Sequence, residues 1–227
     1  MDIGRSFTYM FDDQDWLKKI AIGGVLNIIP VVSFIPMGYG LRTLNNVAAG
    51  TETPLPEWDD WGGDFTKGLM VTLAALIASI PIWAVQVLSI IVAAVAGETS
   101  DIAGLCVAGV SCLAVLWGIA MLVYLPAAVI RYATKGEFSA FFQFGEVFAF
   151  IRDNLSDYIV AILLILAAGV VASVVGSIAC IIGAFFTAFW ATLVSSHLMG
   201  QLQAEAATAA GPGGFATTDL SSEEGDS

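Results

Sequence analysis

Four carboxylates stand within eight residues of one another, and they are the first residues of this chain whose type and spacing could do chemistry. They are Glu57, Asp59, Asp60 and Asp64. Clustered carboxylate oxygens bind hard cations such as Ca²⁺ and Mg²⁺, but the EF-hand spacing is missing and Trp58 and Trp61 separate the acids. Acids at a helix start, flanked by aromatic residues at a membrane interface, are the simpler interpretation. We therefore predict no metal site and no cofactor.

The single histidine, His197, is the only other candidate for acid–base work. It could relay a proton or bind a ligand, but it follows two serines at the end of an apolar stretch, where an interface role is more usual. The chain has no Gly-x-Ser-x-Gly elbow, which would support hydrolysis. The three cysteines, Cys106, Cys112 and Cys180, lie in apolar segments without a CxxC pair, so we expect them to be packing residues. The sequence predicts no enzyme, and a membrane hydrolase built on the four carboxylates is the weakest hypothesis.

A few uncharged polar residues stand inside apolar segments and could line a path for a neutral or lipid-like substrate. They are Asn27, Gln86 and Tyr124. Amides at such depth more often hydrogen-bond between helices. No ionisable side chain lies inside a predicted span, which argues against proton- or ion-coupled transport.

The elements that must position these residues are membrane helices. The chain of 227 residues is 58% hydrophobic and only 12% charged, whereas soluble domains carry about 25% charged residues. The 43 residues from Tyr158 to Gly200 contain no Lys, Arg, Asp or Glu, and about 20 residues cross a bilayer once. We predict an all-α polytopic membrane protein with a membrane domain at 20–200, and its segments are about 20–41, 68–96, 102–130, 158–175 and 178–200. The last two are expected to join near Gly176 and Ser177.

The first segment, residues 20–41, is long enough to cross but is broken by Pro30, Pro36 and several glycines. It is either a kinked span or a re-entrant hairpin that enters and leaves on one side. A re-entrant hairpin puts all eight basic residues on one side, and basic residues favour the cytoplasm. We therefore favour the hairpin, four full spans and cytoplasmic termini, in the plasma membrane of a bacterium or archaeon.

Polar and aromatic segments flank the spans. Residues 1–19 read as an amphipathic lead-in, residues 49–67 and 136–157 as interfacial segments, and residues 201–227 as an acidic disordered tail. The expected interface anchors are Trp16, Trp58, Trp61, Phe141 and Phe148.

Small residues recur every four positions in the last two segments and predict close helix contacts. They include Ala168, Ala172, Gly176, Ala184 and Ala188. The contact is between the last two helices or between subunits. The partners expected are therefore the lipid bilayer and further copies of the chain or a larger membrane complex. A net charge of −12 disfavours nucleic acid.

Several short motifs resemble one membrane family. They are Asp15 to Lys19, Ile22 to Gly24, Gly38 to Arg42, Leu55 to Gly62, Phe65, Gly68, Phe144 to Glu146 and His197 to Gln201. Together they are similar to the prokaryotic family called domain of unknown function 4013, over roughly residues 10–203, and the Pro56 to Gly62 run is the most specific part. The resemblance implies a small multi-span membrane protein and no known activity. The function expected is a non-enzymatic structural or accessory component; the alternative is a facilitator or channel for a neutral or lipid-like substrate.

Overall fold

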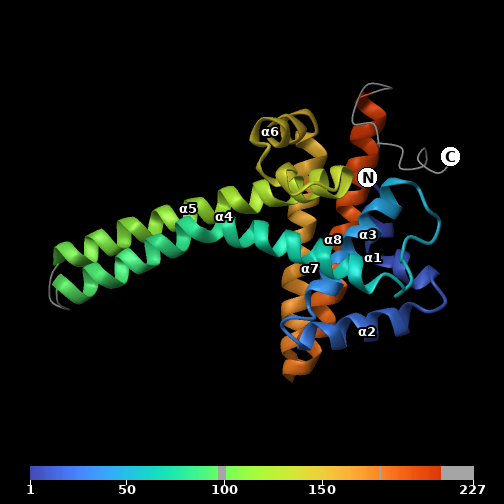
Figure 1. Cartoon of the computed structure of the whole chain (residues 1–227), viewed down its shortest axis with the longest axis horizontal. Helices are drawn as coiled ribbons and strands as arrows, with labels where there is room; N and C mark the ends of the chain where they lie inside the picture. The colour runs from blue at the N-terminus through green and yellow to red at the C-terminus, as the bar shows by residue number, and fades with distance from the viewer. Residues whose placement is uncertain (97–100, 179, 211–227) are drawn as a thin grey trace, which may run out of the picture.

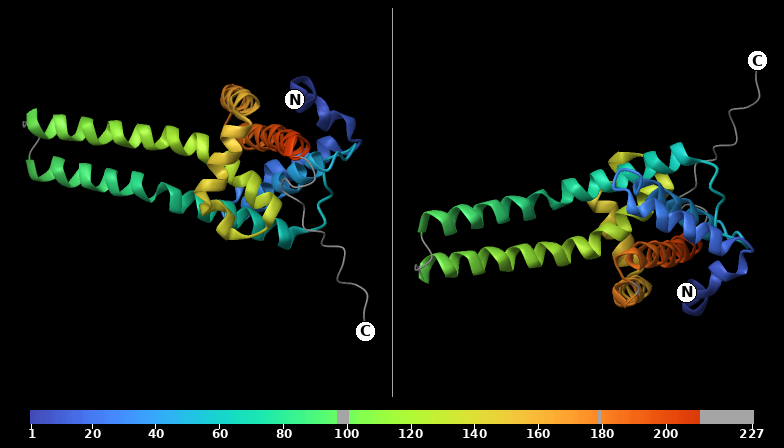
Figure 2. Two further views of the ribbon diagram at one scale, coloured as in Figure 1. Left: turned by 90° about the horizontal axis from the view of Figure 1, so that it is seen from above. Right: turned by 90° about the horizontal axis from the view of Figure 1, so that it is seen from below.

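Two long helical hairpins dominate the computed structural model, which describes residues 1–96, 101–178 and 180–210. The first hairpin pairs α4 (Trp61–Ala96) with α5 (Asp101–Lys135), and the second pairs α7 (Leu155–Ile178) with α8 (Cys180–Ala210). Figure 1 shows the first hairpin projecting sideways as an arm while the second stands upright beside it, and both views of Figure 2 show the arm clear of the other helices. Each hairpin supplies two helices long and apolar enough to cross a membrane, four in all among the described residues. The all-α membrane fold with four full spans is therefore confirmed.

Short helices separated by a break form the N-terminal part of the chain. The chain begins with α1 (Ile3–Thr8) and a 3-10 turn η1 (Tyr9–Asp12), followed by α2 (Trp16–Ile28) and α3 (Phe34–Ala48). The break falls at residues 29–33, where Pro30 has no amide hydrogen to give a continuing helix. Pro36 lies in the first turn of α3, where backbone N–H groups have no partner within the helix, so it does no harm there.

Glycines let α3 cross α4 at close range. A β-carbon on Gly38 would overlap the backbone of Asp64, and one on Gly68 would overlap the carbonyl of Phe34. On the other side, α2 lies against α8 with Gly23 and Gly24 facing the rings of Phe189 and Phe186. The glycines of the broken segment thus serve close packing as well as the break.

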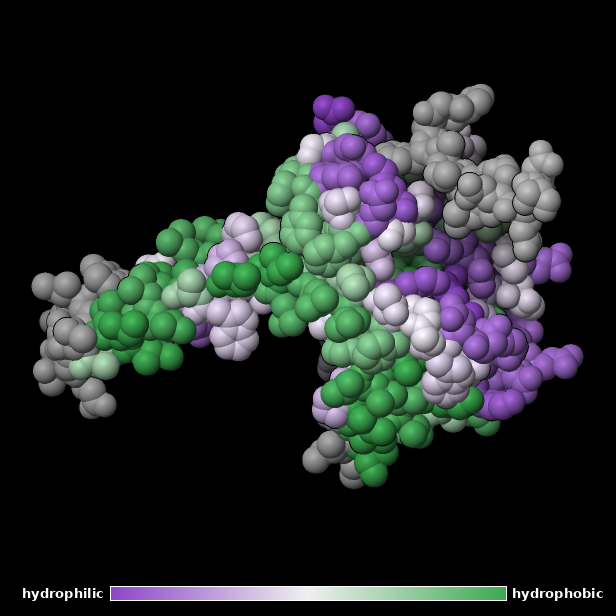
Figure 3. Space-filling view, in the orientation of Figure 1, coloured by the Kyte–Doolittle hydropathy of each residue, from purple (hydrophilic) through white to green (hydrophobic). Residues whose placement is uncertain are grey.

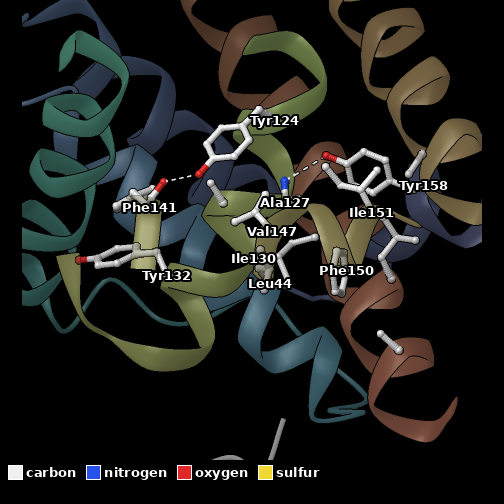
Figure 4. Packing of buried hydrophobic residues seen from close by; sticks show 14 of the residues in the cluster. Leu44, Tyr124, Ala127, Ile130, Tyr132, Phe141, Val147, Phe150, Ile151 and Tyr158 are labelled. Carbon is white, nitrogen blue, oxygen red and sulfur yellow. Dashed lines mark hydrogen bonds between the residues drawn. The ribbon is translucent and has the colours of Figure 1, made fainter. Parts of the chain in front are cut away.

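A short helix, α6 (Phe144–Asp153), follows the 3-10 turn η2 (Phe138–Phe142) and covers one end of the hairpins. Residues 136–157 were predicted to form one interfacial segment, but the apolar residues of η2 and α6 divide between surface and core. Phe144 and Phe148 are exposed, whereas Phe141 and Ile151 are buried. Phe141 is therefore a core residue and not an interface anchor, because the 3-10 turn directs its ring onto Tyr132, 4.6 Å away. Figure 4 shows this core.

The last helix is longer than the sequence predicted. Residues 201–210 were assigned to the disordered tail, but α8 continues to Ala210. Leu202 and Ala206, one turn apart, are buried in the core, and the alanines around them favour helix. The turn expected near Gly176 and Ser177 lies within α7. The tail beyond 210, the turn at 97–100 and residue 179 lie outside the described residues.

The surface separates by polarity. In Figure 3 apolar residues cover the arm and the lower end of the upright hairpin, while polar residues gather on the side that carries the N-terminal helices. Only 6% of the apolar window of α4 is buried inside the protein. A helix that is apolar on all sides needs lipid or another protein around it. Four such helices establish this chain as a membrane protein.

Candidate functional site

The acidic segment at residues 57–64 closes over the N-terminal helices and is the most connected polar site in the described structure. Three hydrogen bonds position it: Asn46 Nδ2 donates to the carbonyl of Pro54 at 2.9 Å, the Tyr39 hydroxyl to Pro56 at 2.7 Å, and Trp58 Nε1 to the carbonyl of Lys19 at 3.3 Å. The segment is therefore tied to α2 and α3 before α4 begins.

Lys19, at the start of α2, is a buried cation within this site. Its Nζ lies 2.7 Å from Asp13, 2.6 Å from Glu57 and 3.3 Å from the carbonyl of Leu55. Burial by itself lowers the pKa of the ammonium group, but hydrogen bonds with Asp13 and Glu57 outweigh it, and the pKa of Lys19 is raised. Lys19 is charged at neutral pH and fixes the acidic segment to α2.

Arg42, near the end of α3, binds the same segment from the other side. Its guanidinium donates to Asp59, to Asp64 and to the carbonyl of Glu57, each at 2.8 Å. Asp64 is fully buried, while Asp59 is exposed. The hydrogen bond from Arg42 lowers the pKa of Asp59 below 3.8. Desolvation opposes the charge of Arg42, yet its pKa is raised by Asp59 and Asp64.

The four carboxylates thus bind three different partners, one of which, Arg42, two of them share. Glu57 binds Lys19, Asp59 and Asp64 bind Arg42, and Asp60 accepts the N–H of Gly63 at 2.9 Å, as the cap of α4. Within residues 1–96, 101–178 and 180–210, no three His, Cys, Asp or Glu side chains converge as metal ligands. The arrangement joins helices, and it gives the metal hypothesis no support.

Aromatic rings cover the inner side of the acidic segment. The Trp58 ring stacks on Tyr39 with centroids 4.1 Å apart, and it lies 5.9 Å from Phe189 of α8. Trp61 Nε1 donates to the carbonyl of Trp58 at 2.8 Å, and the Trp61 side chain is exposed. Trp16 is half-buried against Phe11. Of the predicted anchors, Trp61 and Phe148 are thus the exposed ones, and Trp58 packs inward.

Basic residues at the end of α5 form a second polar cluster with α6. Buried Arg131 pairs with Glu146, and Lys135 lies 3.4 Å from the same carboxylate. Gln143 accepts hydrogen bonds from both cations, at 2.7 and 3.0 Å. This cluster holds α6 against the arm.

His197 joins the N-terminal helix to α8. Its Nδ1 lies 3.0 Å from the Ser6 hydroxyl and 3.2 Å from Gln201 Nε2, and its ring stacks on Tyr9 at 4.3 Å. Ser6 and His197 are both buried. The pair therefore serves packing and is closed to a substrate. Sequence reasoning missed it, since Ser6 is 191 residues from His197.

The three polar residues proposed to line a path lie apart. Asn27 donates to the carbonyl of Phe185 in α8 at 3.3 Å, and Tyr124 donates to the carbonyl of Phe141 at 2.7 Å. Gln86 is on the exposed surface of the arm. The structure does not bring them together around one cavity.

The small residues of α7 and α8 have two different surroundings. Ala168, Ala172 and Gly176 are buried, and a β-carbon on Gly176 would lie 2.7 Å from the Cα of Ala184. Ala184 and Ala188 are exposed and line a groove of about 500 Å³ where the two hairpins meet. We call this the small-residue groove. The residues of α7 and α8 that line it are Ile165, Gly169, Ala172, Ser173, Ala184, Thr187, Ala188, Ala191, Thr192, Ser195, Ser196 and Met199, and α3, α4 and α5 add Met37, Leu41, Leu44, Val71 and Val129.

Comparison with known proteins agrees with this architecture. Residues 22–181, well over half of the chain, match the family described as "Protein of unknown function (DUF4013)". The chain belongs to this family. It is also 30% identical over 136 residues to an uncharacterised protein, MJ1189, of Methanocaldococcus jannaschii. That match covers 60% of this chain and 46% of the archaeal protein, so the chain spans less than half the length of that relative. No solved structure matches.

The family places no chemistry on these residues, but its motifs coincide with contacts. The resemblance rested on Lys19, Gly38 to Arg42 and the segment from Leu55 to Gly62, and these residues form the acidic site. Glu146 and His197 belong to the other two polar clusters. Of these residues, Lys19 and His197 lie outside the matched range of 22–181, and the others lie where helices contact one another.

Proposed function

We propose that the chain is a non-enzymatic membrane component that associates laterally with copies of itself. The small-residue groove carries this proposal. Two of its lining residues, Ala184 and Ala188, are exposed on α8. Helices associate in bilayers chiefly where small side chains let the backbones approach. The groove therefore suits the face of a helix from a second copy.

The arm supports the same proposal. Its residues project apolar side chains away from the upright hairpin, with Trp83, Ile90 and Leu113 each more than three-fifths exposed. An arm of this length offers a second copy a large apolar surface next to the groove. The polar residues proposed as a pore lie apart, so the facilitator alternative gains no support from the geometry.

The orientation proposed puts the termini in the cytoplasm of a bacterial or archaeal plasma membrane. Lys18 and Lys19 open α2, Lys67 lies in the second turn of α4, and Arg131 and Lys135 end α5. All of these lie at the ends of helices away from the turns of the two spanning hairpins. Basic residues concentrated in this way favour the cytoplasmic side.

Association is tested by filling the groove. Ala188→Leu adds three carbons on the exposed line of α8, and Ala167→Leu adds the same atoms to an exposed position of α7 outside the groove. The parent protein and Ala167→Leu are expected to form dimers or larger assemblies in lipid nanodiscs, counted by stepwise photobleaching. Ala188→Leu is expected to raise the dissociation constant at least about tenfold, equivalent to about 1.4 kcal/mol. A parent protein that stays monomeric at every protein-to-lipid ratio would refute self-association. Equal dissociation constants for the two variants would show that the contact between copies lies outside the groove.

A further inference from the structure

The broken N-terminal segment begins and ends at one residue of the acidic site. Lys19, at its start, has its Nζ 2.6 Å from the Glu57 carboxylate. Arg42, near its end, donates to the Glu57 carbonyl at 2.8 Å. Two side chains that bind the same residue cannot lie on opposite faces of a hydrocarbon layer about 30 Å thick. The chain between Lys19 and Arg42 therefore begins and ends on the same side of the membrane.

The lengths of the two helices agree with a return. The 13 residues of α2 and the 15 residues of α3 would measure about 20 and 22 Å at about 1.5 Å per residue. Each is shorter than the hydrocarbon core. Each can enter it, and neither can cross it alone.

The turn between these helices is suited to a medium without water. Its backbone groups bond within the turn: the amides of Val32 and Ser33 donate to the carbonyl of Ile29, at 3.0 and 2.9 Å, and the Ser33 hydroxyl donates to the carbonyl of Pro30 at 2.6 Å. Irregular backbone at membrane depth requires such internal partners. The side chains at the turn are apolar and outward: Ile29 is 51% exposed and Val31 is 64% exposed.

The turn is also continuous with a surface that lipid must cover. Gly23 and Gly24 of α2 pack on Phe189 and Phe186, and Asn27 bonds to the carbonyl of Phe185. All three phenylalanines belong to the apolar part of α8, within the candidate span Ile182–Ala209. The exposed residues of α2 and the turn therefore extend the lipid-facing surface of α8.

We propose that α2 and α3 form a re-entrant hairpin, which dips into the leaflet on the side of the Lys19–Arg42 cluster and presents Ile29 and Val31 to lipid chains. The acidic segment closes the hairpin at its base by binding both of its ends. This insertion is independent of self-association, since it depends on contacts within one chain.

Single cysteines in a background without Cys106, Cys112 and Cys180 test the proposal in the full chain. Lys18→Cys lies in the first turn of α2 and Thr51→Cys lies after the end of α3, and both positions are exposed; Leu17→Cys and Glu52→Cys, also exposed, duplicate them. In sealed vesicles, a membrane-impermeant charged maleimide is expected to label all four from the same side. Thermal unfolding matched to the cysteine-free parent shows that each variant is folded.

A nitroxide attached to Val31→Cys reports whether the turn between α2 and α3 lies in lipid or in water. In lipid vesicles, oxygen is expected to broaden its electron paramagnetic resonance signal, whereas a water-soluble nickel chelate is not, because the label lies among lipid chains. Labelling of Lys18→Cys and Thr51→Cys from opposite sides would mean that the segment crosses the membrane. A nitroxide at 31 that the nickel chelate reaches would mean that the turn lies in water. Either result overturns the proposal, and neither depends on whether the protein is a monomer.

Discussion

The hydroxyl of Tyr158 in α7 accepts a hydrogen bond from the amide of Ala127 in α5, 3.1 Å away, and donates one to the carbonyl of Val123. These two backbone groups are the donor and acceptor of one helical turn, so the hydroxyl is inserted into the hydrogen-bond ladder of α5 just after Pro126. Figure 4 shows Tyr158 reaching across to Ala127. The contact joins the arm to the upright hairpin where α5 has already lost one amide donor.

Tyr158→Phe should therefore loosen the connection between the hairpins. The variant removes a buried bridging hydroxyl and is expected to lower the free energy of unfolding by about 1–2 kcal/mol. Thermal unfolding in detergent micelles measures the loss. Tyr132→Phe is the matched control, since Tyr132 is equally buried but its hydroxyl has no hydrogen bond within the described residues. Equal losses in both variants would show that the inserted hydroxyl contributes nothing of its own.

Glycine-to-alanine changes should have opposite effects at two positions. Gly68→Ala places a methyl group against the carbonyl of Phe34, so α3 and α4 must separate, and we expect a loss of about 2 kcal/mol or more. Gly118 lies within α5 with nothing near its missing β-carbon, so Gly118→Ala should stabilise the helix by about 0.5–1 kcal/mol. The midpoints of thermal unfolding compare the two. A midpoint for Gly68→Ala at or above that of the parent protein would contradict the close crossing of α3 and α4.

Asp64→Asn tests the buried end of the acidic site. Asp64 is fully buried and accepts a hydrogen bond from Arg42, so the variant leaves the guanidinium without its buried counter-charge. The expected loss of stability is about 2–3 kcal/mol, below the usual cost for a fully buried pair because Arg42 keeps Asp59. Asp153→Asn, an exposed carboxylate outside this site, is expected to change the unfolding midpoint little. If Asp64→Asn has the same midpoint of thermal unfolding as Asp153→Asn, the Arg42–Asp64 pair does not stabilise the fold.

These contacts show which part of the structure the sequence could predict. Charge-free stretches such as 158–200 predicted helices because only helices satisfy the backbone in lipid, and the four spans are confirmed. The break at Pro30 was visible too, whereas Gly38 lies inside the continuous helix α3. The directions of the two hairpins were not, because an apolar helix surface carries no signal about which neighbour covers it.

The sequence identified the charged residues that lie between the helices, but not which of them pair. Glu57 and Asp64 attracted attention as carboxylates, but their partners Lys19 and Arg42 stand 38 and 22 residues away, and only the fold brings them together. Phe141 was predicted to be an interface anchor, but it lies in a 3-10 turn and its ring is buried in the core. Periodicity locates a face only while the helix type stays constant.

The acidic site should hold its structure across a wide range of pH and open at acid pH. The folded pKa of Asp59 is lowered, so its contribution is present above its unfolded value of 3.8 and is lost as the pH falls through the folded value. The folded pKa of Lys19 is raised, so its contribution is present below 10.5 and is lost only as the pH rises through a still higher value. In a variant that keeps Trp58 and replaces the other five tryptophans by phenylalanine, we expect the fluorescence to be constant near neutral pH and to change below about pH 4, where Asp59 is protonated. Desolvation raises the pKa of buried Asp64, and this opposes part of the loss. In Arg42→Gln the acid transition should weaken, and a transition near neutral pH in the parent would contradict the assignment.

The N-terminal helix should detach when its contact with α8 is removed. His197→Phe keeps a ring against Tyr9 but loses the hydrogen bonds to Ser6 and Gln201. Ser6 keeps the carbonyl of Asp2 as acceptor, so the variant loses one buried hydrogen bond of the hydroxyl, worth about 0.5–1.5 kcal/mol. Residues 3–12 should therefore exchange their amide hydrogens faster while α7 stays protected. Hydrogen exchange followed by mass spectrometry measures both regions in one experiment. Thr8→Val, which removes only a hydrogen bond to Gly4 within the same segment, should leave exchange in that segment nearly unchanged. If the two variants exchange alike, the Ser6–His197 contact does not hold the N-terminal helix. Its other contacts with α8, which are the packing of Tyr9 and Met10, the Tyr9 hydroxyl on the carbonyl of Leu193 and the bonds between Asp2 and Gln201, then hold it.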